Sequence, residues 1–308
     1  EYGAVGDGST DDTTAIQAAI TAAASTGRTQ NTVFLPSLRY KVTSPLIMSS
    51  GIRLTGDYAG TYIDAIHTGT SIVDMVGCTT SAIENITLNG DATTTPKTGI
   101  LVGRDGSGGG AQNRFCRVRI IGEFTAAPIY SISAEDNYWE NIQVTLSGGG
   151  ALYGAYFSNA DTLSVGGLTI GASAWDTHIS GMQITNAVDS ASAAALYLDV
   201  ETYFQGFTCI GGYFITVNGA YIQLNVSGNT NGGISFINPV GECAAGGGSQ
   251  PYGMNITGDY TLSGLFVLNA NFTRSTNAFA KAAPIILKHC FIHDSINGIG
   301  IDTVTPAA

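Results

Sequence analysis

Residues 134–144 read AEDNYWENIQV, and residues 174–184 read AWDTHISGMQI. An alanine, an aspartate and a glutamine occupy matching positions in the two segments, each pair 40 residues apart. The apolar residues match as well, since Trp139 corresponds to Ile179 and Val144 to Ile184. Similarity at a constant offset is typical of proteins built from stacked repeats.

The pattern apolar-x-x-apolar-x-apolar recurs along the chain. Its predicted starts are Ile83, Phe115, Trp139, Ile179, Phe204, Ile234, Leu262 and Leu287. This spacing suits a coil of about two dozen residues, and the longer intervals contain glycine-rich insertions at residues 103–110 and 148–161. A coil buries its apolar side only by stacking on its neighbours, each about 4.8 Å further along the axis. The pattern predicts a parallel β-solenoid with residues aligned in ladders.

Composition agrees with an all-β chain and excludes several functions. The 308 residues are 44% hydrophobic and only 11% charged, with 41 glycines that can form the tight corners of coils. A net charge of −11 provides no basic face, so we expect no nucleic acid partner and no membrane insertion. Five cysteines without C-x-x-C spacing predict free, mostly buried thiols. We expect no metal and no cofactor.

The N-terminal segment predicts one helix and the first strands. Asp11 is expected as the N-cap of a helix over residues 12–24, which Gly27 would end. Strands are expected over residues 33–36, 39–44 and 51–56, between proline and glycine residues. The chain starts at Glu1 rather than at a methionine, so we expect that residues before it are not included.

A family resemblance lies in the same segment. It rests on Tyr2-Gly3-Ala4, Gly6-Asp7-Gly8, Asp11-Asp12-Thr13, Ala15-Ile16-Gln17, Val33-x-Leu35-Pro36 and Leu54-x-Gly56. These motifs resemble the opening of the pectate-lyase-like, right-handed parallel β-helix superfamily, and within it the bacteriophage tailspike depolymerases. The resemblance implies a right-handed parallel β-helix with a short N-terminal capping helix. It also implies a homotrimer in the virion tail, assembled in the host cytoplasm, that acts outside the cell on bacterial surface polysaccharide.

We divide the chain into an N-terminal segment, residues 1–82, and a β-helix body, residues 83–308. The body departs from the polygalacturonases of this fold, because no histidine lies between two glycines. Pectin is therefore not the expected substrate.

The repeat aligns three carboxylates. Asp136, Asp176 and Glu201 each stand three residues before a predicted start, so we expect them on one corner of successive coils. Like charges at this spacing raise one another's pKa, which lets one member act as a general acid. The alternative is that the aspartates only form turns through hydrogen bonds to the local backbone.

A second carboxylate pair lies in residues 196–204, LYLDVETYF. If Leu196, Leu198 and Val200 point inward, then Tyr197, Asp199, Glu201 and Tyr203 point outward on one face. Carboxylates two residues apart on a strand are roughly 6.5 to 7 Å apart, close to the separation in inverting glycosidases. The tyrosines could stack on sugar rings, although the stretch could also be a solvated strand face.

Further candidates surround these acids. Arg119, Gln143 and Gln183 share the outward fourth position of the pattern and would form a polar stripe that binds hydroxyl or carboxylate groups. Trp175 is a candidate for sugar binding, and His178 is either a base or a structural residue.

The sequence thus predicts a depolymerase that hydrolyses capsular or O-antigen polysaccharide with paired carboxylates, in which Glu201 and Asp199, or Glu201 and Asp176, serve as acid and base. The alternatives are a lyase that acts on uronic-acid-containing capsule and a non-catalytic receptor-binding fibre.

Overall fold

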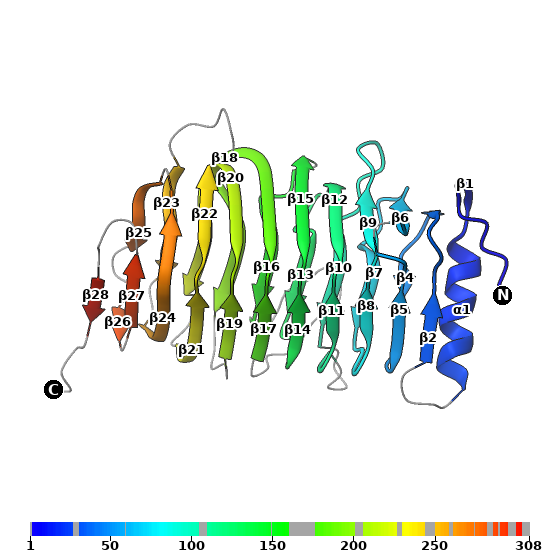
Figure 1. Ribbon diagram of the computed structural model, residues 1–308, viewed down its shortest axis with the longest axis horizontal. Helices are drawn as coiled ribbons and strands as arrows, with labels where there is room; N and C mark the ends of the chain where they lie inside the picture. The colour runs from blue at the N-terminus through cyan, green and yellow to red at the C-terminus, as the bar shows by residue number, and fades with distance from the viewer. Residues whose placement is uncertain are drawn as a thin grey trace.

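The computed structural model describes residues 2–26, 31–58, 60–104, 110–148, 150–159, 176–200, 206–226, 230–243, 250–258, 261–273, 275–281, 286–288, 290–294 and 300–303. Within these residues the chain forms a stack of coils, with helix α1 (Thr13–Ser25) at the N-terminal end (Figure 1). Neighbouring coils pair through parallel strands, which confirms the predicted β-solenoid.

The strands form three parallel sheets around the core. Sheet 1 consists of β2 (Asn31–Phe34), β5 (Ile52–Thr55), β8 (Ala82–Glu84), β11 (Arg114–Cys116), β14 (Asn137–Glu140), β17 (Asp176–Ser180), β19 (Gly206–Ile210), β21 (Thr230–Ile237), β24 (Thr261–Phe272), β26 (Ile286–Lys288) and β27 (Cys290–Asp294). The last strand, β28 (Gly300–Thr303), is antiparallel to β27. The N-terminal segment already contributes to this sheet, because Val33 pairs with Leu54 and Leu54 with Ile83.

The other two sheets share long strands. Sheet 2 consists of β1 (Asp7–Asp11), β3 (Arg39–Val42), β6 (Tyr62–Ala65), β9 (Thr87–Gly90), β12 (Arg119–Glu123), β15 (Gln143–Gly148), the first parts of β18 (Gln183–Val200) and β20 (Tyr213–Val226), and β22 (Val240–Cys243). Sheet 3 consists of β4 (Leu46–Ile47), β7 (Ser71–Val76), β10 (Thr98–Gly103), β13 (Ile129–Ile132), β16 (Tyr153–Ser158), the second parts of β18 and β20, β23 (Gln250–Gly258) and β25 (Ser275–Lys281).

The core follows the sequence repeat over its first four coils. Ile83, Phe115, Trp139 and Ile179 pair in one continuous register and are at most 2% exposed. The rings of Phe115 and Trp139 stack with centroids 3.8 Å apart. The four cysteines whose side chains are described are free and buried, as predicted.

The later repeat starts were wrong. Cys209, Phe236, Val267 and Ile292 continue the register of Ile179, whereas the sequence pattern placed the starts two or five residues earlier. In the coils that start at Cys209 and Phe236, Gly212 and Pro239 occupy the fourth position of the pattern, where an apolar residue was expected. The pattern therefore matched earlier apolar residues, such as Phe207 and Cys209 of β19, which both point into the core.

The turn after the strands of sheet 1 marks where each coil lies in the sequence, which the apolar pattern alone leaves undecided. Asn85, Arg117, Asn141, Asn238 and Asn269 all have φ between +52° and +58°, and each stands two residues after an inward position of sheet 1. Asparagine adopts this left-handed conformation more readily than most residues. Backbone hydrogen bonds continue through the corner, for example from the Asn141 N–H to the Ser180 carbonyl at 2.8 Å.

A second corner, before each strand of sheet 1, is held by buried asparagines. The Asn113 side chain accepts a hydrogen bond from the Ser81 N–H at 3.0 Å and donates to the Cys78 carbonyl at 2.9 Å. The Asn137 side chain accepts from the Asn113 N–H at 2.9 Å. Because both asparagines are fully buried, these bonds satisfy backbone groups that water cannot reach.

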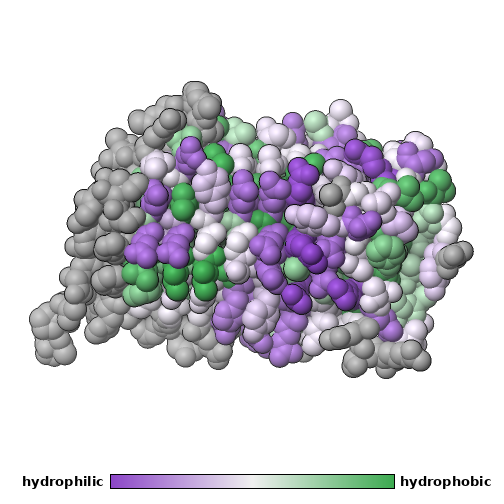
Figure 2. All heavy atoms as spheres, viewed as in Figure 1, coloured by the Kyte–Doolittle hydropathy of each residue, from purple (hydrophilic) through white to green (hydrophobic). Residues whose placement is uncertain are grey.

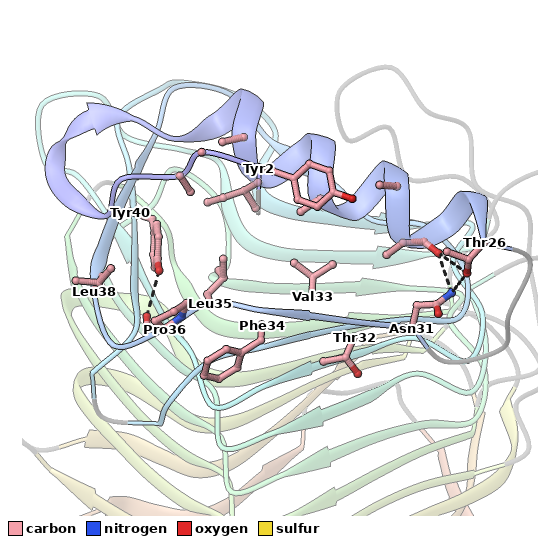
Figure 3. A pocket seen from close by; sticks show the side chains of 17 residues that line it. Tyr2, Thr26, Asn31, Thr32, Val33, Phe34, Leu35, Pro36, Leu38 and Tyr40 are labelled. Atoms are coloured by element: carbon pink, nitrogen blue, oxygen red, sulfur yellow. Dashed lines mark hydrogen bonds between the residues drawn. The ribbon is translucent and has the colours of Figure 1, made fainter.

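Helix α1 closes a cavity of ≈ 720 Å³ against β2 and β3, and Figure 3 shows the side chains that line it. Ile16 and Ile20 of the helix belong to the buried core. The helix starts one residue later than predicted, with Asp12 as N-cap, although the Asp11 carboxylate accepts the Thr13 N–H at 3.0 Å. The lining is mostly apolar and holds no carboxylate, so the cavity belongs to the packing of the helix.

In the described part of the chain, no helix is long and apolar enough to span a membrane.

The buried asparagines generate a prediction for stability. Replacing Asn113→Ala leaves the Ser81 N–H without its acceptor and removes one of two hydrogen bonds to the Cys78 carbonyl, which keeps the one from the Gly110 N–H. We therefore expect a loss of about 2 to 4 kcal/mol in the free energy of unfolding. Asn89→Ala is the control, because Asn89 is half-buried and bonds only the Asp64 side chain. It should cost about 1 kcal/mol or less in the same urea titration. Equal losses in the two variants would contradict this role for the buried corner.

Candidate functional site

Two carboxylates, those of Asp136 and Asp176, lie at the N-terminal ends of adjacent strands of sheet 1. Asp136 immediately precedes β14, and Asp176 starts β17, the next strand of the sheet. Asn137 pairs with Thr177, so the two aspartates occupy equivalent positions on adjacent coils. Asp136 has a φ of +52°, which places it in the turn that leads into the strand. The sequence therefore predicted the proximity of these two acids correctly.

Two rings complete the cluster. The Tyr138 hydroxyl donates a hydrogen bond to Asp136 Oδ1 at 2.9 Å, and His178 Nε2 lies 3.3 Å from Asp176 Oδ1. The rings of Tyr138 and His178 stack with centroids 5.0 Å apart. The hydrogen bond to the Asp136 carboxylate raises the pKa of Tyr138, so the phenol remains a proton donor.

The cluster is compact enough to act as a unit. One ligand atom each from Asp136, Asp176 and His178 lie within 4.8 Å of one another, so these three residues could also hold a divalent cation. Their side chains are accessible, since those of Asp176 and His178 are 37% and 42% exposed.

A depression of ≈ 430 Å³ on the outer face of sheet 1 adjoins the cluster. Tyr138 and His178 line it together with Arg114, Glu140, Thr208 and Ile210. Arg114 forms an ion pair with Glu140 at 2.9 Å, which raises the pKa of the guanidinium and lowers that of the carboxyl. A molecule bound in this depression would touch Tyr138 and His178, which contact the two aspartates, and the apolar side chain of Ile210.

The prediction that Glu201 lies on the same corner as Asp136 and Asp176 is wrong. Gly206, not Glu201, pairs with Asp176 in the next coil. The physical reason is the length of β18, which runs through both sheet 2 and sheet 3 and delays the return of the chain to sheet 1. Glu201, Tyr203 and Trp175 lie outside the described residues, so their predicted roles stay predictions.

The strand face predicted around Asp199 exists. Leu196, Leu198 and Val200 are fully buried, whereas Tyr197 and Asp199 point outward from sheet 3. Both oxygens of Asp199 accept hydrogen bonds at 2.9 Å, one from the Tyr156 hydroxyl and one from the Asn225 amide. Asp199 is thus part of a side-chain network on a different face from Asp136 and Asp176.

Stacked tyrosines surround Asp199. Tyr130, Tyr156 and Tyr197 follow one another in register, with centroid distances of 4.7 and 5.2 Å, and Tyr153 lies 4.2 Å from Tyr197. Burial, with the Asp199 carboxylate as a further cause, raises the pKa of Tyr130 to about 12. Burial also raises the pKa of Tyr156 and Tyr197. The sequence pattern missed Tyr130 and Tyr156, whose signal was a tyrosine at the same register position on three successive strands of sheet 3, β13, β16 and β18.

The predicted polar stripe is present on sheet 2. Arg119 pairs with Gln143, and Gln143 with Gln183, which places the three side chains in one outward column. Among the described residues no carboxylate forms an ion pair with Arg119, and its Nε is buried without a hydrogen-bond partner. The role of Arg119 in substrate binding stays a prediction.

The tyrosine stack generates a prediction for alkaline pH. A phenol whose pKa is raised in the folded state contributes stability below pH 10, and this contribution is lost as the pH rises toward 12. We therefore expect the free energy of unfolding to fall over that interval, and to fall less in Tyr156→Phe. Denaturant titrations at several pH values measure it. A constant stability between pH 10 and pH 12 would contradict the assignment.

Three solved structures illustrate the similarity of fold. The catalytic domain of Agl-KA is 16% identical, with a TM-score of 0.61, over 93% of this chain and 56% of that one. The tailspike of E. coli bacteriophage HK620, in complex with a pentasaccharide, is 10% identical, with a TM-score of 0.44, over 92% and 64%. The A-module of the Azotobacter vinelandii mannuronan C-5 epimerase AlgE4 is 17% identical, with a TM-score of 0.40, over 93% and 96%.

The comparison with curated proteins found no match. A family model, described as rhamnogalacturonase A/epimerase, pectate lyase-like, matches residues 1–191, which is more than half of the chain. That match includes the N-terminal motifs and both aspartates of the cluster, and the strand pairing described above extends the same solenoid beyond it. On this ground the chain belongs to the rhamnogalacturonase A/epimerase, pectate-lyase-like family.

Proposed function

We propose that this protein is a depolymerase that hydrolyses bacterial surface polysaccharide with Asp136 and Asp176. The fold and the family are those of polysaccharide-acting proteins. The observation that carries the proposal is the pairing of these two carboxylates on adjacent coils, beside a depression open to solvent. Two carboxyl groups that flank a glycosidic bond are the usual machinery of glycoside hydrolysis.

The separation of the pair favours a double displacement. One carboxylate oxygen of Asp136 lies within 4.8 Å of one of Asp176, which is nearer to the ~5–5.5 Å of retaining enzymes than to the ~6.5–9.5 Å of inverting ones. Inverting enzymes need the larger gap because a water molecule attacks between the carboxylates. We therefore assign Asp136 as the nucleophile and Asp176 as the acid and base.

The neighbours of the pair suit these roles. The Tyr138 hydroxyl donates to Asp136 Oδ1, which orients the carboxylate that we assign as the nucleophile. In the first step Asp136 forms a bond to the anomeric carbon, and Asp176 gives its proton to the departing glycosidic oxygen. In the second step Asp176 takes a proton from water, whose oxygen displaces Asp136. His178, 3.3 Å from Asp176, orients the acid.

A lyase is the second candidate, because Tyr138 and His178 add a phenol and an imidazole to the same cluster. Elimination from a uronic acid requires a positive group that binds the sugar carboxylate. Arg114 is the nearby cation in the depression, but Glu140 already neutralises it. The charge of the described site therefore favours hydrolysis.

The place of action is part of the proposal. The sequence resemblance to tailspikes supports a homotrimer in a virion tail that meets polysaccharide on the bacterial surface. A non-catalytic receptor-binding fibre on the same scaffold would bind the polymer without shortening it. Light scattering tests the trimer, since a monomeric mass at micromolar concentration would exclude it.

The acid pair generates the test of function. We expect Asp176→Asn to lower kcat by about 10²- to 10⁴-fold, which is the usual contribution of a general acid. Asp189→Asn is the matched control, because Asp189 is an exposed aspartate of β18 remote in register from β17. It should keep full activity in an assay of new reducing ends, with both variants folded by circular dichroism.

The products of cleavage distinguish hydrolysis from elimination by a lyase. Hydrolysis gives reducing ends without an unsaturated sugar, and the new anomeric centre keeps its configuration in NMR spectra recorded immediately after cleavage. A product that absorbs in the ultraviolet would instead establish a lyase. Full activity of Asp176→Asn would remove this pair from the mechanism.

A further inference from the structure

An exposed apolar column continues the site along sheet 1. Ser180 pairs with Ile210, Ile210 with Ile237, and Ile237 with Leu268, so three aliphatic side chains follow one another on consecutive coils. Ile210 is 45% exposed, and Ile237 and Leu268 are half-buried. Figure 2 shows a row of apolar atoms on the face of the molecule that carries β19, β21 and β24. We name these three residues the apolar strip.

The strip is continuous with the candidate site. Ile210 lines the same depression as Tyr138 and His178, whose side chains contact the two aspartates. Consecutive coils are about 4.8 Å apart, so an extended glycan that lies along the axis would place successive parts on successive rungs. In the column of Asp176 the next two rungs hold Gly206 and Gly233, whereas Ile210 lies four residues further along β19. A glycan bound at the aspartates would therefore cross the depression obliquely to Ile210 and from there follow the axis to Ile237 and Leu268.

Charge defines what this surface can bind. On the outer face of sheet 1, the arginine side chains of the described strands are paired, Arg53 with Glu84 and Arg114 with Glu140. The chain as a whole carries a net charge of −11. Arg117, in the turn after β11, is exposed but lies over the Tyr58 ring and near Glu140. In the described part of this face a polyanionic glycan would therefore meet like charge and only arginines that already contact another side chain, whereas an uncharged glycan would not be repelled.

Resting on the proposed function, we propose that the substrate is an uncharged polysaccharide that bears acetyl or 6-deoxy groups, whose methyls lie on the apolar strip. Sugar hydroxyls alone would lose hydrogen bonds to water against aliphatic side chains. Methyl groups instead gain from leaving water, and a strip of branched side chains is complementary to them. Neutral, methyl-bearing sugars thus satisfy both the charge and the shape of this surface.

The experiment measures binding in the Asp176→Asn background, so that cleavage does not interfere. Three purified probes are compared by isothermal titration calorimetry: a rhamnose-rich O-polysaccharide, an O-acetylated glucomannan, and alginate as a polyuronate without methyl groups. Ile210→Thr with Ile237→Thr removes methyl contacts and keeps β-branched residues. Ile47→Thr is the matched control, because Ile47 is 50% exposed on β4, outside sheet 1.

We expect at least one methyl-bearing probe to bind at least tenfold more tightly than alginate. The double strip variant should weaken that binding by about tenfold, which is typical for lost apolar contacts in a specificity site, while Ile47→Thr leaves it unchanged. For the glucomannan, mild alkaline deacetylation should remove the effect of the strip variant.

Four results would overturn the inference: tighter binding of alginate, unchanged affinity in the strip variant, binding of none of the probes, or a change of molar mass in the strip variant. The last result would show that a second copy of the chain covers the strip. Cleavage by Asp176→Asn would contradict the proposed mechanism alone, because the strip variants report on affinity independently of catalysis.

Discussion

The parallel pairing of each coil with the next is the constraint on which the rest of the structure depends. No coil buries its apolar side alone, so Phe115 and Trp139 are stable inside only because neighbouring rungs cover them. The backbone hydrogen bonds that join the coils continue through the corners, where Asn141 holds a positive φ. The register of the chain is therefore fixed rung by rung, and with it the position of every outward side chain.

The candidate site is a consequence of that register. Asp136 and Asp176 lie 40 residues apart in the sequence, and equivalent positions on adjacent rungs bring them together. The same pairing stacks Tyr138 on His178 and aligns the apolar strip beyond them. In sheet 3 the same register between coils stacks outward tyrosines on one another around Asp199.

The sequence predicted the solenoid and the proximity of the two aspartates, because the repeat pattern matches the strand register from β8 through β11, β14 and β17. It could not predict the frame of the later coils. In the coils that start at Cys209 and Phe236, the fourth position of the pattern holds Gly212 and Pro239, so the pattern matched apolar residues earlier in the chain. The left-handed corner residue two positions after Trp139 or Phe236 carries the missing information, and asparagine at that position is its signal.

The chemistry of the site was harder to predict than its position. The pattern aligned the acids, but their hydrogen bonds depend on side-chain directions, such as that of the Tyr138 hydroxyl toward Asp136. The network that engages Asp199 likewise joins strands far apart in sequence, since Tyr156 and Asn225 lie on different coils. The contact between Asp199 and Asn225 joins register partners within one ladder, whereas the Tyr156 hydroxyl reaches Asp199 from the neighbouring ladder, which periodicity alone does not predict.

The central claim is that Asp136 and Asp176 cleave the glycosidic bond as one unit, and a double-mutant cycle on kcat tests it most directly. Asp136→Asn, Asp176→Asn and the double variant are compared on the same polysaccharide. Groups that act together show strongly non-additive losses. We therefore predict that the double variant is no slower than the slower single variant, whereas losses that multiply would contradict the account.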